Sequence, residues 1–255
     1  MTTCGHTRIV ALFKDSVPFL HATCDLILPR FLFGKNYSVH IPTRDEWTNN
    51  KVIIPDDIVC YMDGSKLDNI GSTGAGIYNY VNGKELVFPL GKYATVYQAE
   101  IYAILLCATR LQEEVNQSIC ICSDSQGALK ALSTIRITSM LVSETVDARQ
   151  VLSAHNGVRL LWVPGHCNIV GNERADQLAK QAAATGFIGP EAVLDLDLSV
   201  DSVQLLIHRW AVNEQIKLWQ QHSHHCDDAD AFLVPCCRGD GDFVLESCRC
   251  DGDSS

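Results

Sequence analysis

The sequence predicts an α/β domain built on a mixed sheet with helices on both faces. Three strand-like runs joined by short turns come first, between residues 58 and 90, and helical and strand patterns alternate after them. Successive strands joined by short turns form an antiparallel meander, whereas alternating helices and strands indicate parallel pairing. The expected order is β-β-β-α-β-α-α-β-α, which gives five strands in one sheet.

The first strand, Ile58 to Ser65, is a nearly unbroken apolar run that contains a carboxylate, Asp63. Apolar side chains on both faces indicate that both faces are covered, and an ionised carboxylate there is costly to bury without a partner. A turn-rich segment leads to a second strand, residues 75–80. The dipeptide Asn82-Gly83 then predicts a tight hairpin into a third strand, residues 85–90.

The first long helix is predicted by Thr95 and Gln98, which have the spacing of a capping box, followed by apolar residues at helical intervals. Glu100 then falls in the second turn of this helix. A buried strand, residues 118–124, ends in Asp124 and continues into a helix over 125–132. A further helix is expected over 139–154, a strand over 158–163, and a closing helix that contains Asp176 and stops near residue 186.

The flanking segments have weaker patterns. We expect residues 1–55 to be a connecting arm with one short helix, at the capping-box spacing of Thr43 and Glu46. Residues 187–255 carry 13 acidic and 4 basic side chains, and we expect one helix over 202–221 followed by a disordered, Cys/His-rich end. That end contains zinc-capable ligands but no C-x2-C pair, so zinc binding is only a minor hypothesis.

Composition limits the function classes. The formal net charge is -10, so the chain lacks the overall basic field that is typical of an independent nucleic-acid binder, although a local site is compatible with this charge. No secretory signal is recognisable and the apolar segments are too short for a membrane span. We expect an intracellular, reducing compartment, nuclear or cytoplasmic, and find no sign of an oligomer.

Four carboxylates stand at informative places: Asp63, Glu100, Asp124 and Asp176. If the first and fourth strands are neighbours, these groups meet at one edge of the sheet, where they could not all stay ionised without cations. Oxygen ligands without thiolates suit Mg²⁺ or Mn²⁺. Two such ions about 4 Å apart would stabilise an in-line phosphodiester displacement, with Asp63 bridging them.

Four ordered motifs carry a family resemblance. They are Met62-Asp-Gly-Ser65, Gln98-Ala-Glu100, Ser123-Asp-Ser-Gln126, and Val163-Pro-Gly-His166 through Gly171-Asn-Glu-Arg-Ala-Asp176. Residues 56–186 thereby resemble a type 1 ribonuclease H domain. Two earlier strings, Gly5-His-Thr-Arg8 and Ile41-Pro-Thr-Arg-Asp-Glu-Trp47, are similar to the carboxy-terminal part of a non-LTR retrotransposon polyprotein, in which the domain follows a reverse transcriptase.

The resemblance implies a ribonuclease H-like fold and a metal-dependent endoribonuclease that cuts the RNA strand of an RNA:DNA hybrid. By the resemblance Asp63, Glu100, Asp124 and Asp176 hold two Mg²⁺ ions, which Mn²⁺ can replace, and His166 assists proton transfer or product release. Further candidates contact the substrate: Gln98 and Gln126 at the minor groove, and Ser65 and Thr73 at phosphates. Gln98 is also explained as a helix cap, and a turn role for Ser65 and Thr73 is about as plausible.

Two other function classes stay open. A non-catalytic hybrid-binding or interaction module from a decayed element would keep the fold and fit the weak basicity, since residues 132–153 contain only two basic side chains, Arg136 and Arg149. A transposase, integrase or resolvase would act on duplex DNA but does not predict a Gly-His loop ten residues before the last aspartate. A reverse transcriptase domain, absent from this chain, is the expected partner.

Overall fold

The computed structural model describes residues 24–49, 51–54, 57–69, 71–185, 199–223, 232–237 and 243–248. The chain divides into two compact units, residues 1–206 and 207–255. The first unit contains all the predicted catalytic residues. None of the helices among the described residues is long and apolar enough to cross a bilayer.

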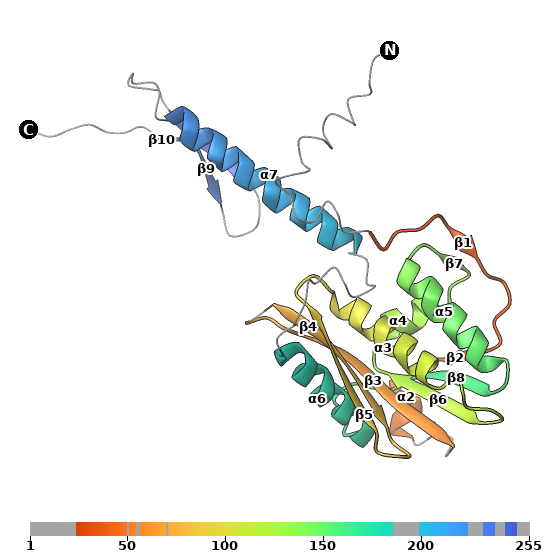
Figure 1. Ribbon diagram of the computed structural model, residues 1–255. Helices are drawn as coiled ribbons and strands as arrows, with labels where there is room; N and C mark the ends of the chain where they lie inside the picture. The colour runs from red at the N-terminus through yellow and green to blue at the C-terminus, as the bar shows by residue number, and fades with distance from the viewer. Residues whose placement is uncertain are drawn as a thin grey trace, which may run out of the picture. The chain divides into compact units, whose positions relative to one another are not determined.

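A mixed sheet of six strands forms the centre of the first unit, as Figure 1 shows. In spatial order its strands are β2 (Ser38–His40), β8 (Gly157–Trp162), β6 (Ser118–Ser123), β3 (Ile58–Leu67), β4 (Ser72–Asn79) and β5 (Glu85–Gly91). The pairs β3–β4 and β4–β5 are antiparallel, whereas β3–β6, β6–β8 and β2–β8 are parallel. The predicted fold class is therefore confirmed: an antiparallel meander continues into parallel pairing.

The sixth strand, β2, comes from the segment that the sequence assigned to a connecting arm. Val39 lies opposite Leu160, so β2 covers the edge of β8. We predicted five strands from the sequence and missed β2, although apolar and polar side chains alternate from Tyr37 to Ile41, a short pattern that is typical of a half-buried strand. A second short pair, β1 (Arg30–Phe31) with β7 (Arg136–Ile137), joins the same segment to the domain.

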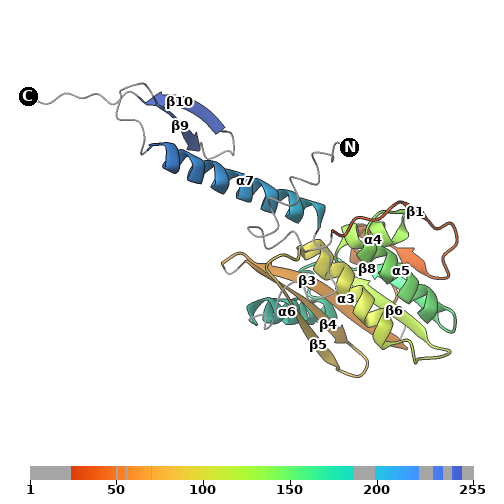
Figure 2. The same cartoon turned by 45° about the horizontal axis from the view of Figure 1, so that its top comes forward.

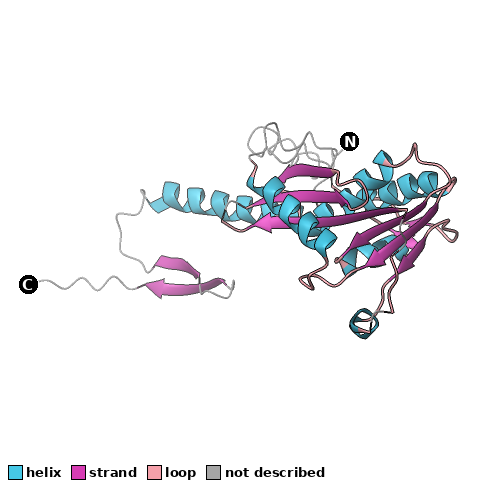
Figure 3. Ribbon diagram, turned by 90° about the horizontal axis from the view of Figure 1, so that it is seen from below, coloured by secondary structure: helices cyan, strands magenta, loops and turns pink. Residues whose placement is uncertain are grey.

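Helices cover both faces of the sheet (Figures 1 and 3). The helices are α2 (Arg44–Thr48), α3 (Val96–Arg110), α4 (Gln126–Ser133), α5 (Met140–Ser153) and α6 (Val170–Ala184). Helices α3, α4 and α5 bury their apolar residues against Cys60 and Met62 of β3. Val59 and Tyr61, which point the other way because side chains alternate along a strand, join a second cluster with Ala175 of α6.

Glycines allow two helices to approach the sheet closely. A Cβ atom added at Gly64 would lie 2.8 Å from the backbone nitrogen of Glu100, so α3 could not sit where it does with a larger residue there. On the other face, a Cβ at Gly76 would lie 2.5 Å from the carbonyl oxygen of Ala175 in α6. The first contact sets how closely α3 approaches β3, and the second sets how closely α6 approaches β4.

The arm is anchored through a buried cation. Arg149 of α5 is fully buried, and its guanidinium carbon lies 3.9 Å from the centre of the Tyr37 ring. Its guanidinium nitrogens have no hydrogen-bond acceptor within the described part of the chain. Burial lowers the pKa of Arg149 to about 10. The Tyr37 ring therefore provides the main stabilising contact for this charge.

The tail contains α7 (Val200–Ser223), which includes the predicted helix 202–221. Beyond it, β9 (Phe232–Cys237) and β10 (Phe243–Cys248) pair with each other in an antiparallel hairpin, as Figure 2 shows. The sequence did not predict this hairpin. The cysteine and histidine side chains of the tail, which suggested zinc, lie outside what the structure describes.

Candidate metal-binding active site

Three of the predicted carboxylates converge at one end of the sheet. Asp63 lies within β3, Glu100 lies in the second turn of α3, and Asp124 directly follows β6. Met62 pairs with Ser123 in the parallel ladder. The next residues, Asp63 in β3 and Asp124 after β6, therefore lie at the same level along the two neighbouring strands. One carboxylate oxygen from each of the three residues lies within 4.8 Å of the others.

Burial and mutual repulsion make this group electrostatically costly when no cation is present. Asp63 is 7% exposed and Glu100 is 4% exposed. Burial, followed by the charge of Asp124, raises the pKa of Asp63 to about 7. Burial and the neighbouring Asp63 also raise the pKa of Glu100 well above its usual value, and burial raises the pKa of Asp124. A cation bound between them would reverse these shifts.

Few hydrogen-bond donors oppose this repulsion. The Gly64 N–H donates to Asp63 Oδ1 at 2.8 Å, and the Ser123 hydroxyl donates to Glu100 Oε2 at 3.2 Å. Asn172 Nδ2 donates to Asp124 Oδ2 at 3.3 Å. These neutral donors cannot balance three carboxylates, and an all-oxygen ligand set suits Mg²⁺ or Mn²⁺. The residues present therefore fit a divalent metal centre.

Ser123 and Asn172 were not predicted as site residues, although both lie inside the quoted motifs. Asn172 is 2% exposed, and its Oδ1 has no partner among the described residues. It links the first turn of α6 to Asp124. The available signal was a polar residue directly beside an acidic one, which is too common in loops and helix starts to select these two.

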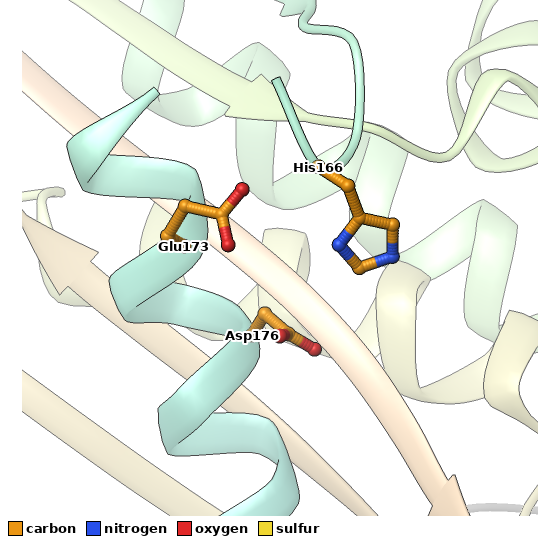
Figure 4. A group of neighbouring side chains, drawn as sticks. All are labelled: His166, Glu173 and Asp176. Carbon is orange, nitrogen blue, oxygen red and sulfur yellow. The ribbon is translucent and has the colours of Figure 1, made fainter. Parts of the chain in front are cut away.

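A second group lies on α6 and the loop before it. Three side chains, those of His166, Glu173 and Asp176, each offer one ligand atom, and these atoms lie within 4.8 Å of one another. Figure 4 shows Glu173 and Asp176 on the side of α6 that faces His166. Lys180 Nζ lies 2.6 Å from Asp176 Oδ2. Glu173 was not a predicted site residue, because its position within a motif did not distinguish it from a solvated helix acid.

The two groups influence each other electrostatically. The charge of Asp176 contributes to the raised pKa values of both Asp63 and Asp124, whereas His166 favours ionisation of Asp124. Gly165 packs so close that a Cβ there would lie 2.6 Å from Asp124 Oδ2. The loop that carries His166 is therefore seated against the carboxylate at the end of β6.

The comparison with protein families agrees with this geometry. Residues 55–184 match the family model described as RNase H. This chain belongs to the RNase H family. Family membership implies an RNA:DNA hybrid as substrate and the use of divalent metal ions, for which the acidic group around Asp63 is suited.

Two predicted substrate contacts of the RNase H domain need correction. Thr73 is fully buried and its hydroxyl donates to the carbonyl oxygen of Ala94 at 2.7 Å, so it does not face a phosphate. Gln98 is 2% exposed, and its Oε1 accepts hydrogen bonds from the Thr95 N–H and hydroxyl groups at 3.1 Å. Both side chains are used within the fold, as the helix-cap alternative for Gln98 anticipated.

The other two predicted substrate residues are accessible. Ser65 lies two residues after Asp63 on β3, and Gln126 opens α4 next to the β6 end; both are partly exposed. The basic side chains between residues 132 and 153 differ, since Arg136 is exposed whereas Arg149 is buried. This region therefore offers a polyanion a single exposed cation, which makes its grip weaker than the sequence count indicated.

Proposed function

We propose that this chain is an endoribonuclease that hydrolyses the RNA strand of RNA:DNA hybrids, leaving a 3′-hydroxyl and a 5′-phosphate. The observation that carries the proposal is the convergence of Asp63, Glu100 and Asp124 at one end of the sheet, with the Asp176 group beside them. Duplex DNA lacks the ribose 2′-hydroxyl that distinguishes RNA at a minor groove, so it is not expected to be a substrate.

In this proposal Asp63, Glu100 and Asp124 would hold one Mg²⁺ or Mn²⁺ ion, and Asp176 would hold a second together with Asp63. When bound, such ions neutralise the phosphate charge and supply an activated water for in-line attack. A bond then forms between the water oxygen and phosphorus while the bond from phosphorus to the 3′ oxygen breaks, and the proton that the attacking water loses passes to the surrounding solvent. His166, exposed on its loop beside Asp124, supplies the proton that the departing 3′ oxygen takes up.

Substrate contact in this proposal falls to Gln126 and Ser65. Gln126 has both donors and an acceptor on its side-chain amide and could read ribose 2′-hydroxyls or base edges. The Ser65 hydroxyl could donate to a phosphate oxygen. Because the region between residues 132 and 153 exposes a single cation, Arg136, we expect it to add little to the salt dependence of hybrid binding.

Cleavage of an end-labelled hybrid tests the proposal. The purified full chain should cut the RNA strand in Mg²⁺, and duplex DNA of the same sequence should stay intact. Asp124→Asn should abolish cleavage, whereas Asp147→Asn, the same chemical change at an exposed ion pair with Arg30, should leave it unchanged. A folded wild-type protein that cuts nothing in Mg²⁺ or Mn²⁺ would overturn the proposal.

A non-catalytic nucleic-acid-binding or interaction module from a decayed element is the second candidate. The single exposed cation between residues 132 and 153 fits a module that depends on a partner to hold its substrate. This candidate predicts that the folded wild-type chain retains labelled hybrid in a filter-binding assay without cutting it. It also predicts that Asp124→Asn leaves the affinity for hybrid unchanged. Cleavage by the wild-type chain would exclude this candidate.

We further propose that the chain is a piece, or a separated relative, of a non-LTR retrotransposon polyprotein. The supporting strings are Gly5-His-Thr-Arg8, which lies outside the described residues, and Ile41 to Trp47, where the Thr43 and Glu46 capping box is formed. A reverse transcriptase domain is the partner that this origin implies. Co-purification with such a domain, and tighter binding of hybrid by the pair, would support the proposal.

A further inference from the structure

The hydroxyl of Ser123 lies among the carboxylates without being a metal ligand in the proposed scheme. Ser123 is the last residue of β6 and is fully buried. Its Oγ donates to Glu100 Oε2 at 3.2 Å and accepts from the Ser125 N–H at 3.0 Å. The Ser125 donor occupies a lone pair of the hydroxyl, so the hydroxyl hydrogen is directed to Glu100.

The backbone on both sides of Ser123 is held firmly. Its carbonyl oxygen accepts from the Val163 N–H at 3.1 Å, at the start of the loop that carries His166. Its ladder position pairs with Met62 in β3 and with Trp162 in β8. The hydroxyl therefore has a fixed place relative to the sheet, whereas Glu100 reaches the site from a helix.

The Gly64 N–H also favours ionisation of Glu100, but two other neighbours of this side chain are acids. Asp63 and Asp124 repel an ionised Glu100 side chain, and rotation away from them would relieve that repulsion. A neutral donor that holds one oxygen of Glu100 keeps the other directed to the shared site. Hydrogen bonds of this kind to metal-ligating carboxylates fix their orientation before the ion arrives.

We propose that Ser123 is a positioning residue for the metal centre, which holds Glu100 in its ligating orientation through a chain from the Ser125 N–H to the Ser123 hydroxyl to the Glu100 carboxylate. This proposal rests on the proposed function, because it takes Glu100 to be a metal ligand. It adds a neutral side chain to the acids and the histidine already assigned. Its role is to set metal affinity, and it makes no contact with the reacting atoms.

An isosteric pair of variants tests this role. Ser123→Thr keeps a hydroxyl and Ser123→Val has the same shape without one, so both carry the same packing cost in the strand. We expect Ser123→Val to weaken Mn²⁺ binding, measured by calorimetry on the full chain without substrate, by about 10-fold or more. Ser123→Thr should stay within about threefold of the wild type.

Kinetics and a control variant separate positioning from general destabilisation. In Ser123→Val the Mg²⁺ concentration for half-maximal cleavage should rise with the dissociation constant, and the KM for hybrid should not change. Ser143→Val removes a buried hydroxyl on α5 that accepts a hydrogen bond from Arg30 of β1, so it should lower the melting temperature without changing metal affinity.

The proposal is overturned if Ser123→Val binds Mn²⁺ as tightly as Ser123→Thr, or if Ser143→Val weakens metal binding equally. The calorimetric result does not require cleavage. A wild-type chain that binds Mn²⁺ in a Ser123-dependent manner but cuts no hybrid would refute the proposed function and keep the positioning role. A wild-type chain that binds no divalent ion would refute both.

Discussion

Asp63→Asn should stabilise the metal-free protein at alkaline pH. In the folded protein the pKa of Asp63 rises from 3.8 to about 7, chiefly through burial. A pKa change of one unit corresponds to about 1.36 kcal/mol of free energy. Ionising Asp63 within the fold therefore costs up to about 4 kcal/mol. An amide of the same shape carries no charge at any pH. Because neighbouring carboxyls still repel each other in the variant, we expect a gain of about 2–4 kcal/mol at pH 8.

The sign of the pH dependence follows from the direction of the shift. Since the folded pKa is raised, the contribution of wild-type Asp63 to stability is fully present below about pH 4 and is lost as the pH rises through about 7. The difference between Asp63→Asn and the wild type should therefore be close to zero at pH 4 and largest above pH 7.

Urea unfolding in EDTA, followed by circular dichroism at several pH values, measures this difference. Adding Mg²⁺ at pH 8 should stabilise the wild type, because the ion offsets the repulsion among the carboxylates. The effect on Asp63→Asn should be much smaller, because this variant has one carboxylate fewer to bind the ion. Equal stability of the two proteins at pH 8, or a gain of the same size at pH 4, would refute the account of the site as a repulsive acidic cluster.

Three further substitutions, the first with a matched control, test the close packing of α3, the donor to Asp124, and the buried cation under the arm. Gly64→Ala should destabilise the fold by about 1–3 kcal/mol in urea unfolding and weaken metal binding, because the added Cβ would lie 2.8 Å from atoms of α3. Gly127→Ala is the control. The nearest atom to a Cβ at Gly127 is 3.9 Å away, so this variant should unfold at the same urea concentration as the wild type. Asn172→Ala should lower metal affinity about 10-fold in calorimetry, since the buried donor to Asp124 is lost. Arg149→Met should raise the melting temperature, because it removes a buried cation whose nitrogens have no acceptor in the described residues; a fall would show that the Tyr37 contact outweighs the burial cost.

The acids of the candidate site could be predicted from the sequence because their signals are local. Asp63 breaks an apolar run, Asp124 ends one, and Glu100 follows a capping box that fixes its helical turn. Each signal gives the position of a residue along an element. The parallel pairing of β3 with β6 then brings these positions to one end of the sheet.

The supporting residues could not be predicted, because their roles depend on distances between elements. Ser123 and Asn172 matter through contacts with Glu100 and Asp124, which come from other helices and strands. Thr73 shows the opposite case, since its motif-like setting suggested a phosphate contact but its hydroxyl is used inside the fold. Arg149 was counted as an available cation, although burial removes it from the surface.

The edge strand β2 has a consequence for how this module can be moved between proteins. A fragment that starts at residue 55, where the family match begins, would leave β8 as an unprotected edge, which is a template for pairing with other chains. It would also remove the Tyr37 ring that lies 3.9 Å from the buried guanidinium carbon of Arg149. The unit that must be transferred to keep the sheet intact is therefore larger than residues 55–184, which the family model matches. A domain exchange that transfers only those residues should give a protein that aggregates.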